Sequence, residues 1–191
     1  MIIIAAVIAF ILGSIPSGYI IGKAWFNTDI RKLGSGNVGS TNALRNFGLK
    51  AGGVTFAMDI LKGFLAVFIG KKLAGYNGML ISYISVVIGH MYSLFLNFKG
   101  GKGVATTFGG LLFIDYKYAL IIVVIFTIVF LLSHIVSLAS ILSAISVFLT
   151  SFLRYEFTPI CWVLMFLSFM VVFRHRSNID RLIHGKEKKL F

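Results

Sequence analysis

Residues 34–45 read GSGNVGSTNALR, a polar and glycine-rich stretch inside an otherwise apolar chain. Two further polar stretches follow, the glycine-rich KGGKGVATT at residues 99–107 and the basic RHRSNIDR at residues 174–181. Backbone exposed to lipid must be helical or belong to a closed barrel, because no water is present there to satisfy its amides and carbonyls. The three stretches must therefore lie in water or line a polar site, and the apolar segments between them are left to form membrane helices.

The composition points to the same class of protein. Of the 191 residues 58% are hydrophobic and only 13% are charged, with a mean hydropathy of +0.95. A soluble domain of this size would need more polar surface. We expect an all-α, polytopic membrane helix bundle that forms a single domain over residues 1–191, without a cleaved signal peptide, because no basic segment precedes the first apolar run.

The basic charge has a simple explanation in such a bundle. The basic residues behind the net charge of +12 lie in islands of the sequence and not along a soluble face, as the excess of Lys and Arg in cytoplasmic loops requires, so we expect no nucleic-acid partner. Cys161 is the sole cysteine, which excludes an intrachain disulfide. The carboxylates and histidines are scattered, and we expect neither a metal nor a cofactor.

About seven membrane helices are predicted. A crossing needs about 20 apolar residues, or fewer where the helix is shielded. Tyr118–Leu153 is too long for one span and should turn at Ser133-His134 or at nearby Ser137, and Pro16 should kink the first span. The other candidates are Ile2–Ile21, Gly52–Ile69, Met79–Phe98, Val104–Ile114 and Thr158–Phe173. Val104–Ile114 is short for a span and could instead be a re-entrant segment.

Charge asymmetry favours seven spans with the N-terminus outside and the C-terminus in the cytoplasm. In that arrangement all three polar stretches face the cytoplasm. The basic residues left on the outer side are few, namely Lys71, Lys72, Lys117 and Arg154. With six spans the third stretch would lie opposite the second and the asymmetry would weaken.

Each polar stretch combines residues that suit a phosphate group. Glycines turn backbone amides toward an anion, and the Arg45 guanidinium offers a two-pronged fork. The second stretch fails the Walker pattern, since Gly103 follows Lys102 where Ser or Thr is required. It still predicts a glycine-rich turn that opens a helix, with free amides and a positive dipole end. The alternative reading is a set of ordinary basic loops.

Ionisable residues within the predicted spans are candidates for structural or functional roles. Asp59 and Lys62 are three residues apart, share a helix face, and are expected to form an ion pair. His90 precedes the second stretch and is either a base in a polar pocket or a hydrogen-bonded histidine of the bundle. His175 and Asp180 have the spacing of an acyltransferase dyad, which we interpret as accidental. The run 186–189 is expected to be a solvated tail near anionic lipid.

The three stretches together resemble the signature motifs of the bacterial membrane glycerol-3-phosphate acyltransferases that use acyl phosphate. The likeness rests on residues 35–45, 99–106 and 175–182, in this order and spacing, and also on GSIPSG at residues 13–18. It implies that the primary hydroxyl of glycerol 3-phosphate attacks a long-chain acyl phosphate, giving 1-acyl-glycerol 3-phosphate and inorganic phosphate. It further implies a protein of the bacterial inner membrane with its site facing the cytoplasm, and we expect a monomer.

The resemblance also implies a set of site residues. The candidate catalytic residues, with His90 added as a possible base, are Ser35, Arg45, His90, Lys102, His175 and Asn178. The candidate substrate-binding residues are Gly36, Asn37, Gly39, Ser40, Thr41, Asn42, Gly100, Gly101, Gly103, Thr106 and Arg176. Because acyl phosphate is already activated, no protein nucleophile is needed.

Two other functions compete with this reading. A carrier for an anionic metabolite could use the same basic loops and a broken helix, but it should expose its site to both membrane faces. A lipid-phosphate phosphatase would need a nucleophile such as His175 supported by Asp180.

Overall fold

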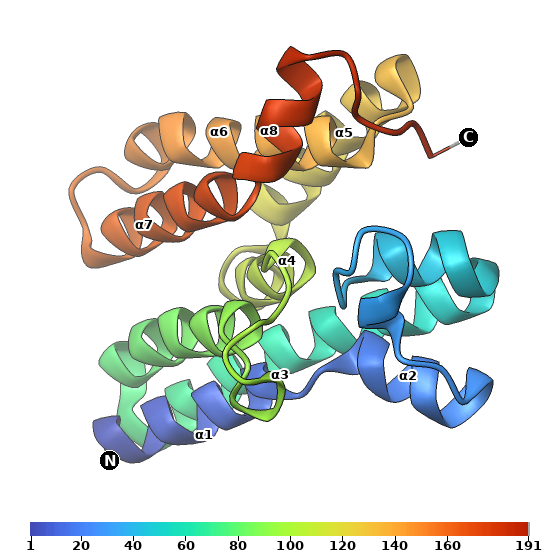
Figure 1. The fold of residues 1–191 in the computed structure, drawn as a ribbon. Helices are drawn as coiled ribbons and strands as arrows, with labels where there is room; N and C mark the ends of the chain where they lie inside the picture. The colour runs from blue at the N-terminus through green and yellow to red at the C-terminus, as the bar shows by residue number, and fades with distance from the viewer. Residues whose placement is uncertain (191) are drawn as a thin grey trace. The chain divides into compact units, whose positions relative to one another are not determined.

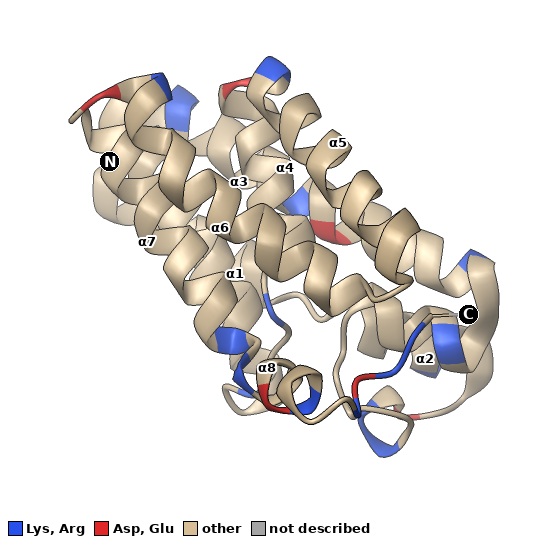
Figure 2. Cartoon of the chain, turned by 90° about the horizontal axis from the view of Figure 1, so that it is seen from above, with Lys and Arg blue, Asp and Glu red and all other residues tan. Residues whose placement is uncertain are grey.

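The structure, a computed structural model, describes residues 1–190. Within that range every regular element is a helix and none is a strand, which confirms the all-α prediction. The chain divides into two compact units, Met1–Ile114 and the part that begins at Asp115. The bodies of α1, α6 and α7 are free of charge except at their ends, as Figure 2 shows, which suits an apolar environment.

The first unit opens with a broken helix. Helix α1 spans Ile2–Ser14 and α2 spans Ser17–Phe26, so the chain leaves the helix at Ile15 and Pro16. Proline has no backbone N–H and disfavours the helical conformation in the residue before it. The predicted kink at Pro16 is confirmed.

Helix α3, Ser40–Met91, is a hairpin of two arms. Non-helical torsions at Gly48, Ala74 and Gly75 divide it into a short start, a first arm at 49–73 and a second arm at 76–91. Gly75 has a φ of 60°, which glycine tolerates best. The predicted segment Gly52–Ile69 lies in the first arm. The predicted Met79–Phe98 was too long, because the second arm ends at Met91 and the chain turns through the 3-10 helix Leu94–Leu96.

Glycines allow these helices to touch through their backbones. A Cβ on Gly13 of α1 would lie 2.1 Å from the Val86 carbonyl oxygen, and one on Gly89 would lie 2.3 Å from that of Phe10. Helix α1 therefore runs against the second arm of α3 (Figure 1). Close approach at small residues is the usual means of packing helices in a membrane.

Helix α4, Val104–Ile114, packs on the first arm by the same means. A Cβ on Gly63 would lie 2.2 Å from the Thr106 carbonyl oxygen, and one on Gly109 would lie 2.1 Å from that of Ile60. The boundaries of α4 agree with the short apolar segment expected from the sequence.

The second unit contains α5 (Tyr116–Ser133), α6 (Val136–Tyr155), α7 (Pro159–Arg174) and α8 (Arg176–Ile183). Of the two positions expected for this turn, Ser133-His134 is the one observed, with His134 left-handed at a φ of 58°, and Ser137 lies inside α6. At the other end of these helices, Asp115 accepts hydrogen bonds from the Tyr118 amide at 3.0 Å and from Arg154 at 2.7 Å. Partial burial would raise the pKa of Asp115, but these bonds outweigh it and hold the pKa below its ordinary value.

By length and hydropathy, four segments within residues 1–190 can cross a membrane, and a fifth is possible if α7 and α8 form one bent span. These segments are Ile2–Phe26, Ser40–Leu96, Tyr116–Ser133 and Val136–Tyr155. Both arms of α3 fall in the long second segment, and α4 is shorter than the length required.

The contact at Gly13 gives a direct test of the helix packing. We expect Gly13→Ala to lower stability by about 1–3 kcal/mol, because the added methyl would overlap the Val86 carbonyl. Thermal unfolding in detergent measures the change. Gly53→Ala is the matched control, since a Cβ at Gly53 meets nothing within 4 Å and alanine is the better helix former. Equal destabilisation by both variants would contradict the packing argument.

Candidate functional site

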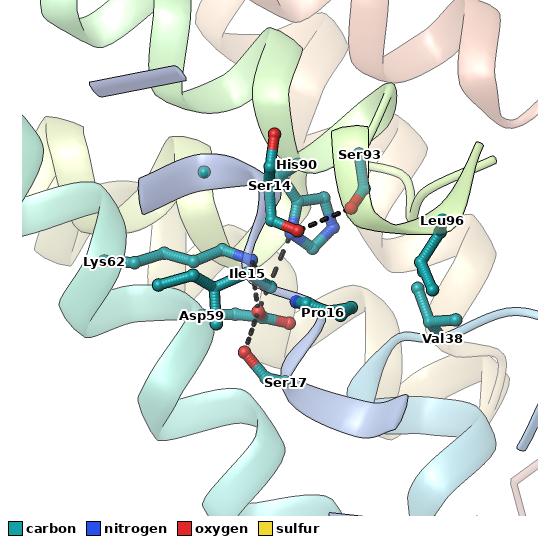
Figure 3. Close-up of a pocket in the computed structure, with 11 residues that line it drawn as sticks. Ser14, Ile15, Pro16, Ser17, Val38, Asp59, Lys62, His90, Ser93 and Leu96 are labelled. Atoms are coloured by element: carbon teal, nitrogen blue, oxygen red, sulfur yellow. Dashed lines mark hydrogen bonds and ion pairs between the residues drawn. The ribbon is translucent and has the colours of Figure 1, made fainter. Parts of the chain in front are cut away.

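A small pocket, with several polar side chains in its lining, lies in the first unit beside the break between α1 and α2. Figure 3 shows side chains from this break, from both arms of α3 and from the following turn converging on it. Its lining consists of Gly13, Ser14, Ile15, Pro16, Ser17, Val38, Asp59, Lys62, His90, Ser93 and Leu96.

The Asp59 carboxylate is the centre of this pocket. Its Oδ1 accepts a hydrogen bond from Ser17 Oγ at 2.8 Å, lies 2.8 Å from Lys62 Nζ, and lies 3.6 Å from His90 Nδ1. The predicted Asp59–Lys62 pair is confirmed, with side chains only 5% and 7% exposed. Lys62 Nζ also donates to the Ile15 carbonyl at 2.9 Å, so the pair satisfies a carbonyl at the helix break.

A second link joins the break to the end of α3. Ser93 Oγ donates to the Ser14 carbonyl at 2.5 Å, and the Leu94 amide donates to Ser14 Oγ at 3.3 Å. These bonds explain why the second arm ends at Met91, since the next residues turn to meet the end of α1.

Asn42 organises the first polar stretch from within. Its Nδ2 donates to the carbonyls of Ile30, Leu33 and Asn37 at 3.3, 3.1 and 2.8 Å, and its Oδ1 accepts from the Ser35 amide at 3.1 Å. Asn42 is buried. Its amide therefore holds the loop over the start of α3.

The surface of this stretch carries the groups that could meet an anion. Ser35, Gly36 and Arg45 are exposed. Gly39 caps α3, so Ser40 and Thr41 form the first turn of that helix, where amides and the helix dipole favour negative charge. Arg45 lies four residues after Thr41, on the same face of the helix. Asn37 Oδ1 accepts from the Gly39 amide at 2.8 Å.

The second polar stretch folds against the end of α3. The Gly101 amide donates to the His90 carbonyl at 3.0 Å and the Gly100 amide to the Met91 carbonyl at 3.1 Å. A Cβ on Gly100 would lie 2.1 Å from the His90 carbonyl oxygen. Glycine is needed here for close approach, in addition to any role in binding.

The predicted glycine-rich turn that opens a helix is confirmed, but the expectation of free amides was wrong at Gly100 and Gly101, whose N–H groups bond the end of α3. Gly103 takes a φ of 86°, and α4 begins at the next residue. Lys102 is half-buried at this helix start. Thr106 is fully buried one turn later, and its Oγ1 lies 3.2 Å from His90 Nδ1.

The structure brings the first and second polar stretches together. Val38 and Ala43 of the first stretch share a buried apolar cluster with Ile30 and with Leu96, which leads into the second. Two candidate phosphate-binding loops are therefore held within one compact unit.

The third polar stretch lies in the second unit, at the bend of 57° between α7 and α8. His175 is buried at this bend, with its Nδ1 2.7 Å from the Val171 carbonyl oxygen. Arg176 is exposed, and its guanidinium lies over the Phe173 ring. Asp180 is 72% exposed, with its carboxylate 3.4 Å from His184 Nδ1.

Glu187 is the residue that sequence reasoning missed. Its carboxylate accepts hydrogen bonds from Ser137 Oγ, Asn178 Nδ2 and Arg181 Nε, each at 2.6 Å. The expected solvated tail was therefore wrong at this position. The tail folds back, and the Leu190 amide donates to the His134 carbonyl at 2.8 Å (Figure 1). The sequence offered one clue to this role, because Glu187 is a single acidic residue among the lysines of the tail.

Comparison with known proteins decides the family. The family model for glycerol-3-phosphate acyltransferase matches residues 3–185. The chain belongs to this family. A glycerol-3-phosphate acyltransferase of Carboxydothermus hydrogenoformans is 46% identical over 100% of this chain and 97% of its own length. The enzyme of Bacillus subtilis is 41% identical over 100% and 98%.

Solved structures of a family member share the fold. The integral membrane glycerol 3-phosphate acyltransferase PlsY (YgiH), in its glycerol 3-phosphate form, superimposes with a TM-score of 0.93 at 37% identity. Its lysophosphatidic acid form gives a TM-score of 0.90 at 36% identity. Both comparisons cover 98% of this chain and 94% of the other.

The Asn42 side chain provides a test of the first loop. We expect Asn42→Ala to destabilise the protein by about 1–3 kcal/mol, because it leaves buried carbonyls unsatisfied. Thermal unfolding in detergent measures the loss. Asn46→Ala is the control, since Asn46 is exposed and its Nδ2 donates to the carbonyl and Oδ1 of Asn42, so the three loop carbonyls bonded by Asn42 stay satisfied. A loss at Asn46 equal to that at Asn42 would refute the assignment.

Glu187 gives a pH-dependent prediction. Partial burial would raise the pKa of Glu187, but the bonds from Ser137, Asn178 and Arg181 lower it below its ordinary value of 4.5. The stabilisation is therefore complete above that value and is lost as the pH falls through the lower folded pKa. We expect Glu187→Gln to lower the unfolding temperature at neutral pH, with the difference from wild type shrinking on acidification. A difference that is independent of pH would contradict this.

Proposed function

We propose that the protein transfers a fatty acyl group from acyl phosphate to the 1-hydroxyl of glycerol 3-phosphate, the first acylation of phospholipid synthesis. The products are 1-acyl-glycerol 3-phosphate and inorganic phosphate. The observation that carries the proposal is the close match, over nearly the whole chain, to an acyltransferase solved in its glycerol 3-phosphate and lysophosphatidic acid forms.

The second polar stretch is assigned to glycerol 3-phosphate. The start of α4 and the Lys102 ammonium provide donors and positive charge for its phosphate. Gly100, Gly101 and Gly103 contribute by shaping the loop, since the Gly100 and Gly101 amides are committed to the Met91 and His90 carbonyls. Thr106 contributes through the His90 ring, which its hydroxyl contacts at 3.2 Å. Lys102 is half-buried. Its ammonium group is therefore held in place and can bind the phosphate there.

The first polar stretch is assigned to the phosphate of the acyl donor. Ser35, Thr41 and Arg45 supply hydroxyl and guanidinium donors near the start of α3. Asn42 contributes by shaping the loop, since its amide is committed to three backbone carbonyls. The others in this group are Gly36, Asn37, Gly39 and Ser40.

The reaction needs positioning and charge stabilisation more than a protein nucleophile. The hydroxyl oxygen forms the ester bond to the acyl carbon, the carbon–oxygen bond to phosphate breaks, and phosphate leaves with its electron pair. Holding both substrates in place can supply about 7–11 kcal/mol of the barrier. The hydroxyl proton passes to the departing phosphate or to a histidine. His175, Arg176 and Asn178 are assigned to the same reaction by the family resemblance.

We further propose the membrane arrangement. The protein crosses the bacterial inner membrane seven times, with the two arms of α3 and the short α4 each counted as crossings. The N-terminus is then outside, and the three polar stretches and the C-terminus are in the cytoplasm. The chain acts as a monomer and a single domain without a cofactor. The small number of Lys and Arg residues that this arrangement leaves on the outer side supports the orientation.

The test is product formation by purified protein in detergent, given palmitoyl phosphate and labelled glycerol 3-phosphate. We expect lysophosphatidic acid and phosphate in equal amounts. Lys102→Ala should raise the KM for glycerol 3-phosphate roughly ten- to a hundredfold, since a hydrogen bond to a charged group contributes about 1.5–3 kcal/mol. Lys99→Ala is the matched control in the same loop, because Lys99 is exposed, and it should retain near-normal KM.

Two outcomes would contradict the proposal. Folded protein that forms no product from either palmitoyl phosphate or acyl-CoA would refute the acyl transfer and make transport in liposomes the next assay. Product from acyl-CoA but not from palmitoyl phosphate would refute the choice of donor.

A further inference from the structure

His90 connects the second polar loop to the interior of the first unit. Its backbone carbonyl accepts from the Gly101 amide at 3.0 Å. A Cβ on Gly101 would lie 2.3 Å from His90 Nε2, so the imidazole lies directly against the loop. On the other side of the ring, Nδ1 is 3.2 Å from Thr106 Oγ1 and 3.6 Å from Asp59 Oδ1.

Asp59, in turn, is anchored to the break that leads to the first polar loop. Ser17, the first residue of α2, donates to its carboxylate, and Lys62 ties the same carboxylate to the Ile15 carbonyl. Figure 3 shows these side chains meeting at one point. Ser17 at the start of α2 therefore contacts Asp59, Asp59 lies near the His90 ring, and the ring lies against the glycine loop.

We propose that His90 is a positioning residue, which holds the loop at residues 100–103 in register with the start of α2 and so with the first polar loop. This inference rests on the acyl transfer proposed above. The ring is 7% exposed, and it is packed between the loop on one side and Asp59 and Thr106 on the other. That placement suits a support for the loop and leaves the hydroxyl proton to another group.

Two substitutions that match each other in shape separate support from proton transfer. His90→Asn places an amide atom close to the position of Nδ1 and can keep a hydrogen bond to Thr106 or Asp59, but it has no imidazole. His90→Leu has the same branched shape as asparagine and no polar atom. If His90 is a positioning residue, activity should fall less in His90→Asn than in His90→Leu. If His90 is the general base, both substitutions should lower activity equally.

Kinetics provide the first readout. We expect His90→Leu to lower kcat/KM about a hundredfold, with most of the loss in the KM for glycerol 3-phosphate, because a displacement of about 1 Å is enough for such an effect. His90→Asn should recover most of that loss. Equal loss of kcat in both variants, with KM unchanged, would overturn the proposal and assign His90 as the base.

Hydrogen exchange provides a readout that does not depend on activity. We expect the amides of residues 100–103 to exchange faster in His90→Leu than in wild type or His90→Asn. Unchanged exchange in His90→Leu would overturn the proposal. If the protein forms no acylated product, the exchange still reports on the loop, so failure of the function and failure of the positioning role are distinguishable.

Two further variants complete the design. Ser82→Ala is the control, because Ser82 is buried in the same unit and its hydroxyl bonds the Ala5 carbonyl; it should change neither KM nor loop exchange. If His90→Leu does not fold, Thr106→Val removes the hydroxyl partner of the same ring with little change of shape. Its loop exchange must then increase, and an unchanged rate would overturn the proposal.

Discussion

A carboxylate inside an apolar helix bundle must be compensated, because an unpaired buried charge costs several kcal/mol. Asp59 meets this constraint with groups from separate places in the chain. Lys62 comes from the same helix, Ser17 from the start of α2 and His90 from the second arm of α3. Satisfying one charge thereby fixes the break between α1 and α2 against both arms of α3. The two polar loops of the first unit are attached to these elements.

Glycine residues allow the helices of this unit to pack with their backbones in contact. Helices α1 and α4 approach the arms of α3 at glycines where a methyl group would overlap a carbonyl. The same property recurs at Gly100 and Gly101, which lie against His90. The glycines of the second polar stretch therefore pack against the bundle, and the Gly100 and Gly101 amides bond its carbonyls. Their presence in a phosphate-like motif has a structural cause in addition to a chemical one.

Much of the local structure could be predicted because its causes are local. Pro16 breaks a helix through its own missing N–H. Asp59 and Lys62 meet because residues three apart share a helix face. Ser133-His134 ends α5 where the apolar run exceeds one span. The helix start after Gly103 followed from glycine and the apolar residues beyond it. The family itself was recognisable from the three polar stretches.

The sequence by itself determined the membrane class, the helix breaks and the phosphate-like loops, since these depend on composition and on neighbours within one or two turns. The tertiary structure decided which distant groups meet. Ser17 and Asp59 are 42 positions apart, and Glu187 is 50 positions from Ser137. Asn42 looked like a phosphate donor, yet its amide is committed to backbone carbonyls of its own loop. Such pairings depend on how the helices pack, and the periodicity of one helix does not show which other segment of the chain packs against it.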